Sequence, residues 1–153
     1  MAYRTLAFLA CTLLYGIALG AKPAAVEVPN RSPEKLVELA THIVTADVVA
    51  IYEREFEARS WATTQYLAEV RVKSVDKGEG IDAEDLIYVR YWDRAWVGGG
   101  HPPPSTSGHR GLPAEGDSVR VHLAQNAYDG FGMPNDDGGF NVIGPNGFTV
   151  LTE

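Results

Sequence analysis

The side chains best suited to molecular recognition gather between Trp92 and Ala114. This segment of about 23 residues carries two tryptophans, two arginines, two histidines and a stiff run of three prolines, and it is long for a connection without regular structure. Flat aromatic rings and guanidinium groups anchor many protein interfaces, because they bury a large area at a small entropic cost. We therefore predict a loop that binds a protein partner. Its candidate binding residues are Trp92, Asp93, Arg94, Trp96, His101, His109 and Arg110.

The same segment allows two other interpretations. In the first, Trp92 and Trp96 fold back to cap one end of the domain and the rest is a simple connection. In the second, His101, His109 and Asp93 bind a metal in a metal-binding protein or a metal-dependent enzyme. Zinc needs three or four such ligands, and the spacing here matches no common zinc motif. The partner-binding loop is therefore preferred to a metal site, the capping interpretation stays open beside it, and no cofactor is predicted.

Motifs for other chemistry are weak. The sequence has no Gly-x-Ser-x-Gly motif of the kind that holds a nucleophilic serine. His122 alternates with apolar neighbours and is expected on the solvated face of a strand. The oxygen-rich cluster Asp129, Asn135, Asp136 and Asp137 has side chains that calcium prefers, but such residues are more typical of a turn. We therefore expect a binding protein rather than an enzyme.

The first twenty residues predict export. An apolar run from Thr5 to Leu19 follows Arg4 and ends in small residues, which is typical of a secretory signal peptide over residues 1–20. The run is short for a membrane-spanning helix, so an uncleaved anchor is the alternative. Cys11 is the only cysteine and leaves with the signal. The mature protein is therefore expected to be secreted or periplasmic and to form no disulfide.

Charge limits the range of partners. The chain carries a net charge of -7, whereas nucleic-acid binding depends mainly on neutralising phosphates with basic residues. We expect no nucleic-acid partner, and a membrane contact only if the signal is retained as an anchor. The predicted partner is another extracytoplasmic or envelope protein.

One short helix and five or six strands account for the rest of the chain. Residues 21–31 read as a linker and residues 32–153 as a single domain. Ser32 and Pro33 begin a helix that ends near Thr41. The density of Val and Ile predicts a buried strand over Ile43–Tyr52. Alternation of apolar and polar residues predicts strands over Thr63–Val75, Ile87–Tyr91 and Ser118–Leu123, and two shorter runs follow over Gly139–Ile143 and Phe148–Leu151.

Strands that never alternate with helices favour an antiparallel architecture. We predict an all-β fold, a small five- to six-stranded OB-like antiparallel barrel with one short N-terminal helix, with a β-sandwich as the alternative. Glu53, Glu55 and Glu57 alternate with arginines and are expected in a charged loop that discourages edge pairing.

Four segments together resemble a known family. They are Ala46–Val49, Tyr66–Gly80, Glu84–Tyr91 and Gly116–Leu123. Their order resembles the tissue-inhibitor-of-metalloproteinase and netrin-like OB-fold domains, including small secreted bacterial relatives. The resemblance implies a five-stranded OB-type barrel. In the animal inhibitors a mature N-terminal cysteine chelates the protease zinc, and since this chain keeps no mature cysteine, only the fold is carried over.

Overall fold

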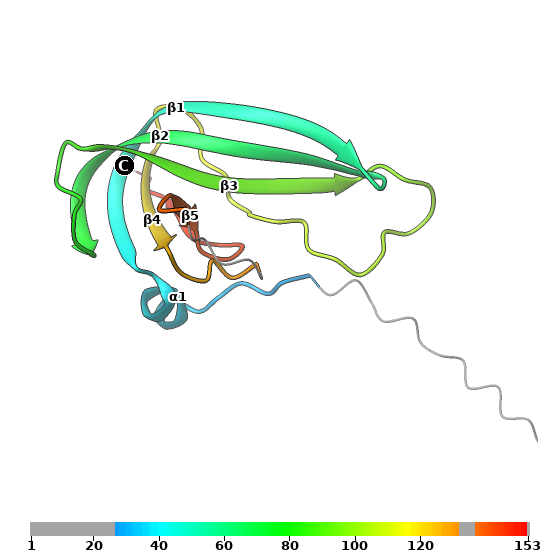
Figure 1. Ribbon diagram of the computed structural model, residues 1–153, viewed down its shortest axis with the longest axis horizontal. Helices are drawn as coiled ribbons and strands as arrows, with labels where there is room; N and C mark the ends of the chain where they lie inside the picture. The colour runs from blue at the N-terminus through cyan, green and yellow to red at the C-terminus, as the bar shows by residue number, and fades with distance from the viewer. Residues whose placement is uncertain (1–26, 132–136, 153) are drawn as a thin grey trace, which may run out of the picture.

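The computed structural model describes residues 27–131 and 137–152 (Figure 1). The elements are α1 (Pro33–Leu39), β1 (His42–Ala58), β2 (Trp61–Lys77), β3 (Leu86–Trp96), β4 (Ser118–Gln125), β5 (Phe140–Val142) and β6 (Phe148–Val150). The predicted helix and all six predicted strands are present, and β1, β2 and β3 are longer than expected. The predicted signal peptide lies outside the described residues. Within the described part, no helix is long and apolar enough to cross a membrane.

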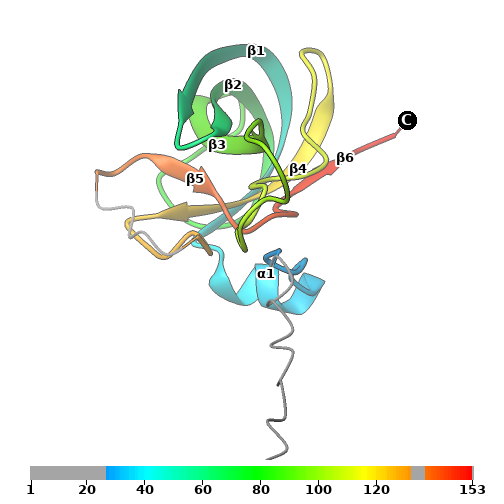
Figure 2. The same ribbon diagram turned by 90° about the vertical axis from the view of Figure 1, so that its right-hand side faces the viewer.

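Five strands form a ring. Hydrogen bonding runs from β1 through β2, β3, β5 and β4 and returns to β1, while β6 joins the sheet beside β4. Figure 2 shows these strands around a common axis. The mostly β fold is confirmed, but the prediction of a purely antiparallel sheet is wrong, because β3 and β5 are parallel. A closed ring with an odd number of strands cannot alternate direction throughout, so one parallel pair is unavoidable.

Strand β1 is bent because it serves two partners. It pairs with β4 over His42–Asp47 and with β2 over nearly its whole length. Its register against β2 shifts at Ile43/Val44, Thr45/Ala46 and Val48/Ala50. Such irregularities bend and twist a strand, and here they allow β1 to curve from β4 to the far end of β2.

Two apolar clusters stabilise the fold. The larger one fills the ring and consists mainly of valines, among them the fully buried Val44, Val70, Val89 and Val121. The smaller one packs α1 against the ring through Leu36, Ala40, Ile43, Ala124 and Ile143. The Ser32 hydroxyl accepts a hydrogen bond from the Lys35 amide at the start of α1, as the sequence predicts.

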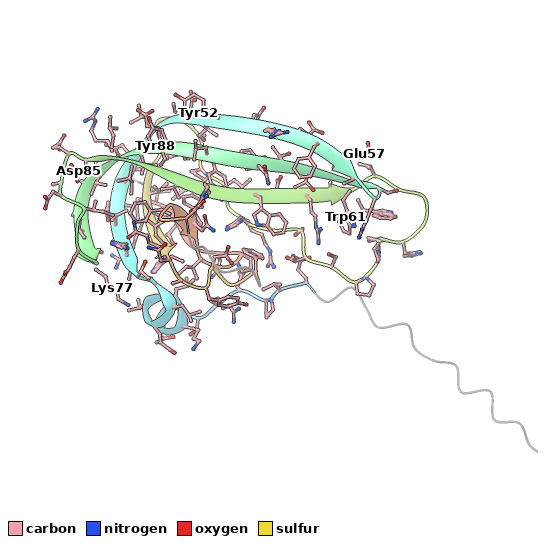
Figure 3. The ribbon with its side chains drawn as sticks, in the orientation of Figure 1. Tyr52, Glu57, Trp61, Lys77, Asp85 and Tyr88 are labelled. Carbon is pink, nitrogen blue, oxygen red and sulfur yellow. The ribbon has the colours of Figure 1, made fainter. Side chains whose placement is uncertain are left out.

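The first three strands extend beyond the ring. Beyond the bulge at Val48/Ala50, β1 pairs only with β2, and both continue to a two-residue turn at Arg59 and Ser60. These two residues have φ values of 52° and 63°, the left-handed conformation that a tight hairpin requires. Figure 3 shows Glu57 and Trp61 at the tip of this hairpin, far from α1. The expected loop over Glu53–Glu57 is therefore wrong, since these residues belong to β1.

The last part of the predicted linker contacts the domain. Arg31 and Asn146 exchange two hydrogen bonds, from the Arg31 amide to Asn146 Oδ1 and from Asn146 Nδ2 to the Arg31 carbonyl. Glu27 accepts hydrogen bonds from Thr106 and Ser107 in the connection that follows β3. Residues 27–31 are thus held beside two segments distant in sequence.

Replacing Val70 by aspartate should unfold the domain. Val70 is fully buried inside the ring, and an unpaired carboxylate there costs several kcal/mol, comparable with the ~5 to 15 kcal/mol stability of a typical domain. Thermal unfolding followed by circular dichroism measures the effect. Ser74→Asp places the same side chain at an exposed position of β2 and should change stability by less than about 1 kcal/mol. Equal melting of the two variants would contradict the inward orientation of Val70.

Candidate binding face

Alternation along the three extended strands gathers arginines and aromatic rings on one face. Pairing places Trp92 opposite Gln65, Arg94 opposite Thr63 and Trp96 opposite Trp61. On β1, Arg54 lies opposite Gln65. Since opposite residues share a face of the sheet, these side chains form one surface, named here the arginine–aromatic face. Its members are Tyr52, Arg54, Phe56, Trp61, Gln65, Arg90, Trp92, Arg94 and Trp96.

Arg94 is the centre of this face. Its guanidinium carbon lies 4.5 Å from the ring centroid of Trp61 and 5.5 Å from that of Trp92. The Trp61 and Trp96 rings meet edge to face with centroids 5.3 Å apart. Arg94 Nε donates to the Thr106 carbonyl at 2.8 Å, and a terminal nitrogen donates to the Ser105 hydroxyl. Cation–π contacts and hydrogen bonds therefore hold the guanidinium in one position.

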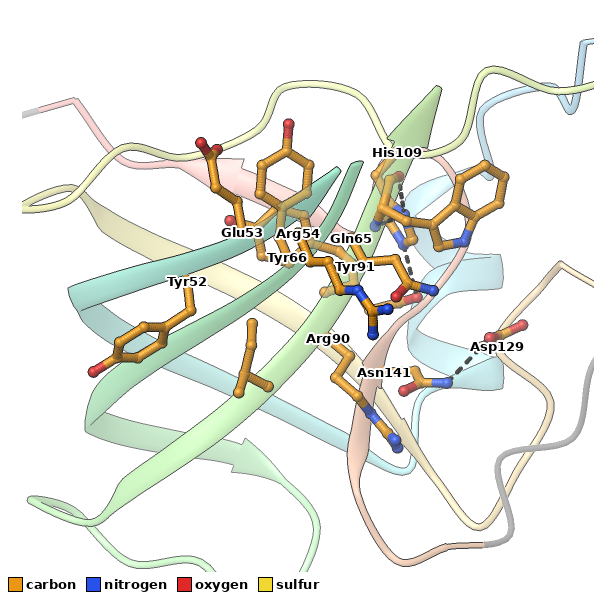
Figure 4. Close-up of a pocket in the computed structure, with 13 residues that line it drawn as sticks. Tyr52, Glu53, Arg54, Gln65, Tyr66, Arg90, Tyr91, His109, Asp129 and Asn141 are labelled. Carbon is orange, nitrogen blue, oxygen red and sulfur yellow. Dashed lines mark hydrogen bonds between the residues drawn. The ribbon is translucent and has the colours of Figure 1, made fainter. Parts of the chain in front are cut away.

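Two adjoining clefts lie on the face. The larger has a volume of about 540 Å³ and the smaller about 380 Å³, and both are lined by Gln65 and Trp92. The larger cleft also extends past this face, because Glu53, Tyr66 and Tyr91 of the opposite face line it as well. Figure 4 shows Arg54, Gln65 and Arg90 extending from three neighbouring strands into the space beside Asn141. Asn141 Nδ2 donates to the buried Asp129 at 3.2 Å. Among the described residues, the buried Asn141 Oδ1 has no hydrogen-bond partner.

The positive charge of Arg90 is balanced internally. Two of its nitrogens donate to the two carboxylate oxygens of Asp137 at 2.6 and 2.7 Å. These hydrogen bonds, with one from the Gly139 amide, hold the pKa of Asp137 well below its usual range. Asp137 thus joins the segment before β5 to β3. Asn135 and Asp136, which the sequence places in the same turn, lie outside the described residues.

His109 is buried next to Trp92, and it contacts the backbone of β3 and β5. His109 Nδ1 lies 3.1 Å from the Trp92 amide nitrogen and 2.9 Å from the Trp92 carbonyl oxygen, and Nε2 lies 3.1 Å from the Val142 carbonyl oxygen. The His109 amide also donates to the Trp92 carbonyl at 2.8 Å. Burial lowers the pKa of His109. Both ring nitrogens therefore serve structure by linking β3 to β5.

The candidate binding residues of the predicted loop lie partly in strand β3 and partly in the connection that follows it. Trp92, Asp93, Arg94 and Trp96 belong to β3 rather than to a loop, because pairing with β2 continues to the hairpin tip. Asp93 lies on the opposite face and accepts a weak hydrogen bond from Tyr66. His101 is exposed in the connection after β3.

Arg110 is turned toward the N-terminal segment. It donates to Asn30 and to the Val28 carbonyl and forms an ion pair with Glu27. Of the candidate binding residues, only Trp92, Arg94 and Trp96 share a face.

The proposed metal ligands do not form a site. Asp93 and Trp92 have opposite orientations, His101 is exposed and His109 uses both nitrogens in contacts with the backbone. Within residues 27–131 and 137–152, no group of three or more His, Cys, Asp or Glu side chains could hold a metal ion.

Sequence reasoning missed Trp61, Arg54 and Gln65 and misplaced His122. The first three join the face only through the register of β1 and β2, which the turn at Arg59 and Ser60 fixes without the glycine or asparagine that usually marks such a turn. His122 is buried rather than solvated, because the segment before β6 covers it and the His122 amide donates to the Gly147 carbonyl. Burial lowers its pKa as well.

Comparison of the chain with protein-family models, with curated proteins and with solved structures finds no match.

Stability should fall as the pH drops below about 6.5, the ordinary pKa of histidine. Because the pKa of His109 is lower in the folded state, the unfolded chain binds the proton first, so the contribution of His109 is complete above pH 6.5 and is lost on acidification. Thermal midpoints of the parent and of His109→Gln, measured between pH 7.5 and 5.5, provide the test. The variant should be less stable at pH 7.5 and should lose less stability on acidification. His122 accounts for a remaining slope, and identical slopes would contradict this role of His109.

Proposed function

We propose that the chain is an extracytoplasmic, non-enzymatic binding module whose arginine–aromatic face binds another extracytoplasmic or envelope protein. The observation that carries this proposal is the cluster of Arg94 with Trp61, Trp92 and Trp96. Neither apolar cluster of the fold includes a tryptophan, so these rings are not needed to fill the ring of strands. Tryptophan and arginine are the residue types most enriched among energetically dominant interface positions.

The order already present in the face supports binding. Arg94 is held between two rings and by two residues of the connection after β3. A partner would therefore lose little entropy by ordering this side chain. The adjoining clefts supply a concave surface in which Arg54, Gln65 and Asn141 offer donors and acceptors beside an aromatic ring.

An OB-like barrel is the finer fold assignment that we propose. A ring of five strands with a strongly curved β1 suits the small, partly open barrel of OB domains. The proposed relationship to the tissue-inhibitor-of-metalloproteinase and netrin-like family rests on this ring and on the sequence resemblance. OB domains bind ligands on the face of their second and third strands, and β2 and β3 carry most of the arginine–aromatic face. This argument is an analogy at the level of fold.

The double substitution Arg94→Ala with Trp96→Ala should abolish most specific partner capture. Removal of two such anchors typically weakens an interface by about 2 kcal/mol or more, which is about thirtyfold in affinity. The measurement is quantitative mass spectrometry of proteins captured from the native envelope fraction by the tagged chain.

A matched control replaces an arginine and an exposed aromatic residue elsewhere, Arg71→Ala with Tyr128→Ala. The control should capture the same proteins as the parent. If the folded Arg94/Trp96 variant also captures them at parental levels, the face does not bind the partner.

Export predicts a mature chain that begins at Ala21. Intact-mass analysis of the protein from its native host should show loss of residues 1–20, because a signal peptidase cuts after small residues such as Gly20. A protein that still begins at Met1 and sediments with membranes would instead be an anchored form.

A further inference from the structure

The outer edge of the hairpin extension lacks a partner strand. Strand β1 pairs with β4 only as far as Asp47, and at Ile51 the amide donates to the side chain of Glu115 at 2.9 Å. From Tyr52 to Ala58, no described residue bonds to this edge, and β1 is the outermost strand of the extension in Figure 1. At roughly 3.3 Å per residue, the open edge is about 20 Å long.

The hairpin turn determines which backbone groups are open. Ala58 and Trp61 close the two-residue turn, so residues at even positions of β1 bond to β2 and those at odd positions point outward. The outward amide of Ile51 agrees with this alternation. The open N–H and C=O groups therefore belong to Glu53, Glu55 and Glu57.

The same three residues give the edge its charge. Their carboxylates are exposed, and their neighbours on β2 are Tyr66, Thr64 and Ala62, none of which is basic. Asp93 on β3 lies opposite Thr64 and adds a fourth acid to this face. No ion pair to Glu53, Glu55 or Glu57 occurs in the described part of the chain.

A second copy of the chain is a poor occupant of the edge. Antiparallel self-pairing centred on Glu55 places Glu53 opposite Glu57 and Glu55 opposite itself, and like charges directly opposite destabilise a sheet. The glutamates therefore protect the edge against self-association. A strand with basic residues at alternate positions can form backbone hydrogen bonds with the open N–H and C=O groups and can also pair its cations with the three glutamates.

We propose that this edge binds an extended peptide segment of a partner by β-strand addition, with lysine or arginine at the alternate positions opposite Glu53, Glu55 and Glu57. Main-chain hydrogen bonds supply affinity in this mode of recognition, and the alternating side chains supply specificity. The edge adjoins the arginine–aromatic face at Tyr52, Arg54 and Phe56, but the proposal uses the open backbone groups and the glutamates and does not depend on that face being a binding site.

A short peptide in which lysine alternates with threonine tests the proposal against the chain beginning at Ala21. Addition of the peptide should shift the amide resonances of Glu53, Glu55 and Glu57 and slow their hydrogen exchange. An analogue N-methylated at the lysine amides keeps every charge but cannot donate the strand hydrogen bonds. Because the analogue loses several strand hydrogen bonds at once, it should bind at least about tenfold more weakly.

Two protein variants complete the test. The triple substitution Glu53→Gln, Glu55→Gln and Glu57→Gln should fold normally and lose most of the affinity. The Arg94→Ala, Trp96→Ala variant should bind the peptide as the parent does, which separates this proposal from that for the arginine–aromatic face. Absence of peptide binding, equal affinity of the N-methylated analogue, or loss of binding in the Arg94/Trp96 variant would each overturn strand addition at this edge.

Discussion

The architecture depends on the ability of β1 to hydrogen-bond along both of its edges. Over Ile43–Asp47 one edge bonds to β4 and the other to β2, so this stretch closes the ring. Three register shifts give β1 the bend that closure requires. Without the bend, β4 and β2 could not share a neighbour, and the valines of the core would not be enclosed. The parallel pairing of β3 with β5 is a further consequence of closing five strands.

Closure also explains where the candidate sites lie. The ring uses only part of β1, β2 and β3, and the remaining ends project beyond it. Among the described residues of the extension, Ile51, Tyr66 and Tyr91 still pack with the apolar core. Beyond them the two faces are free to differ, and simple alternation makes one rich in arginines and aromatic rings and the other acidic. Where β5 ends, the segment Ser107–His109 pairs with β3 and fixes Trp92 and Arg94. The recognition residues thus rest on paired strands, which hold side chains more precisely than a free loop.

The sequence predicts the core of this fold better than its extension. Inside the ring, alternating valines reveal the strands because one face must be apolar. Beyond the ring both faces are polar or aromatic, so the stretches Glu53–Ala58 and Trp92–Trp96 carry no such alternation and are mistaken for loops. The burial of His109 and His122 is equally hidden, because Val142 and Gly147, which bond to them, are distant in sequence. Only the tertiary structure brings these segments together.

The net charge of -7 conceals a separation of charge across the extension. Arg54 and Arg94 lie on one face, together with Arg90, whose charge Asp137 balances. Glu53, Glu55, Glu57 and Asp93 lie on the other face. At physiological ionic strength, interactions between exposed charges fade over about 8 Å, so a partner in contact with one face experiences mainly the charges of that face. The net charge governs only approach from a distance, where it disfavours a polyanion such as nucleic acid. Each surface therefore selects a partner at contact by its own charges, and the two faces and the open edge favour partners of different chemistry.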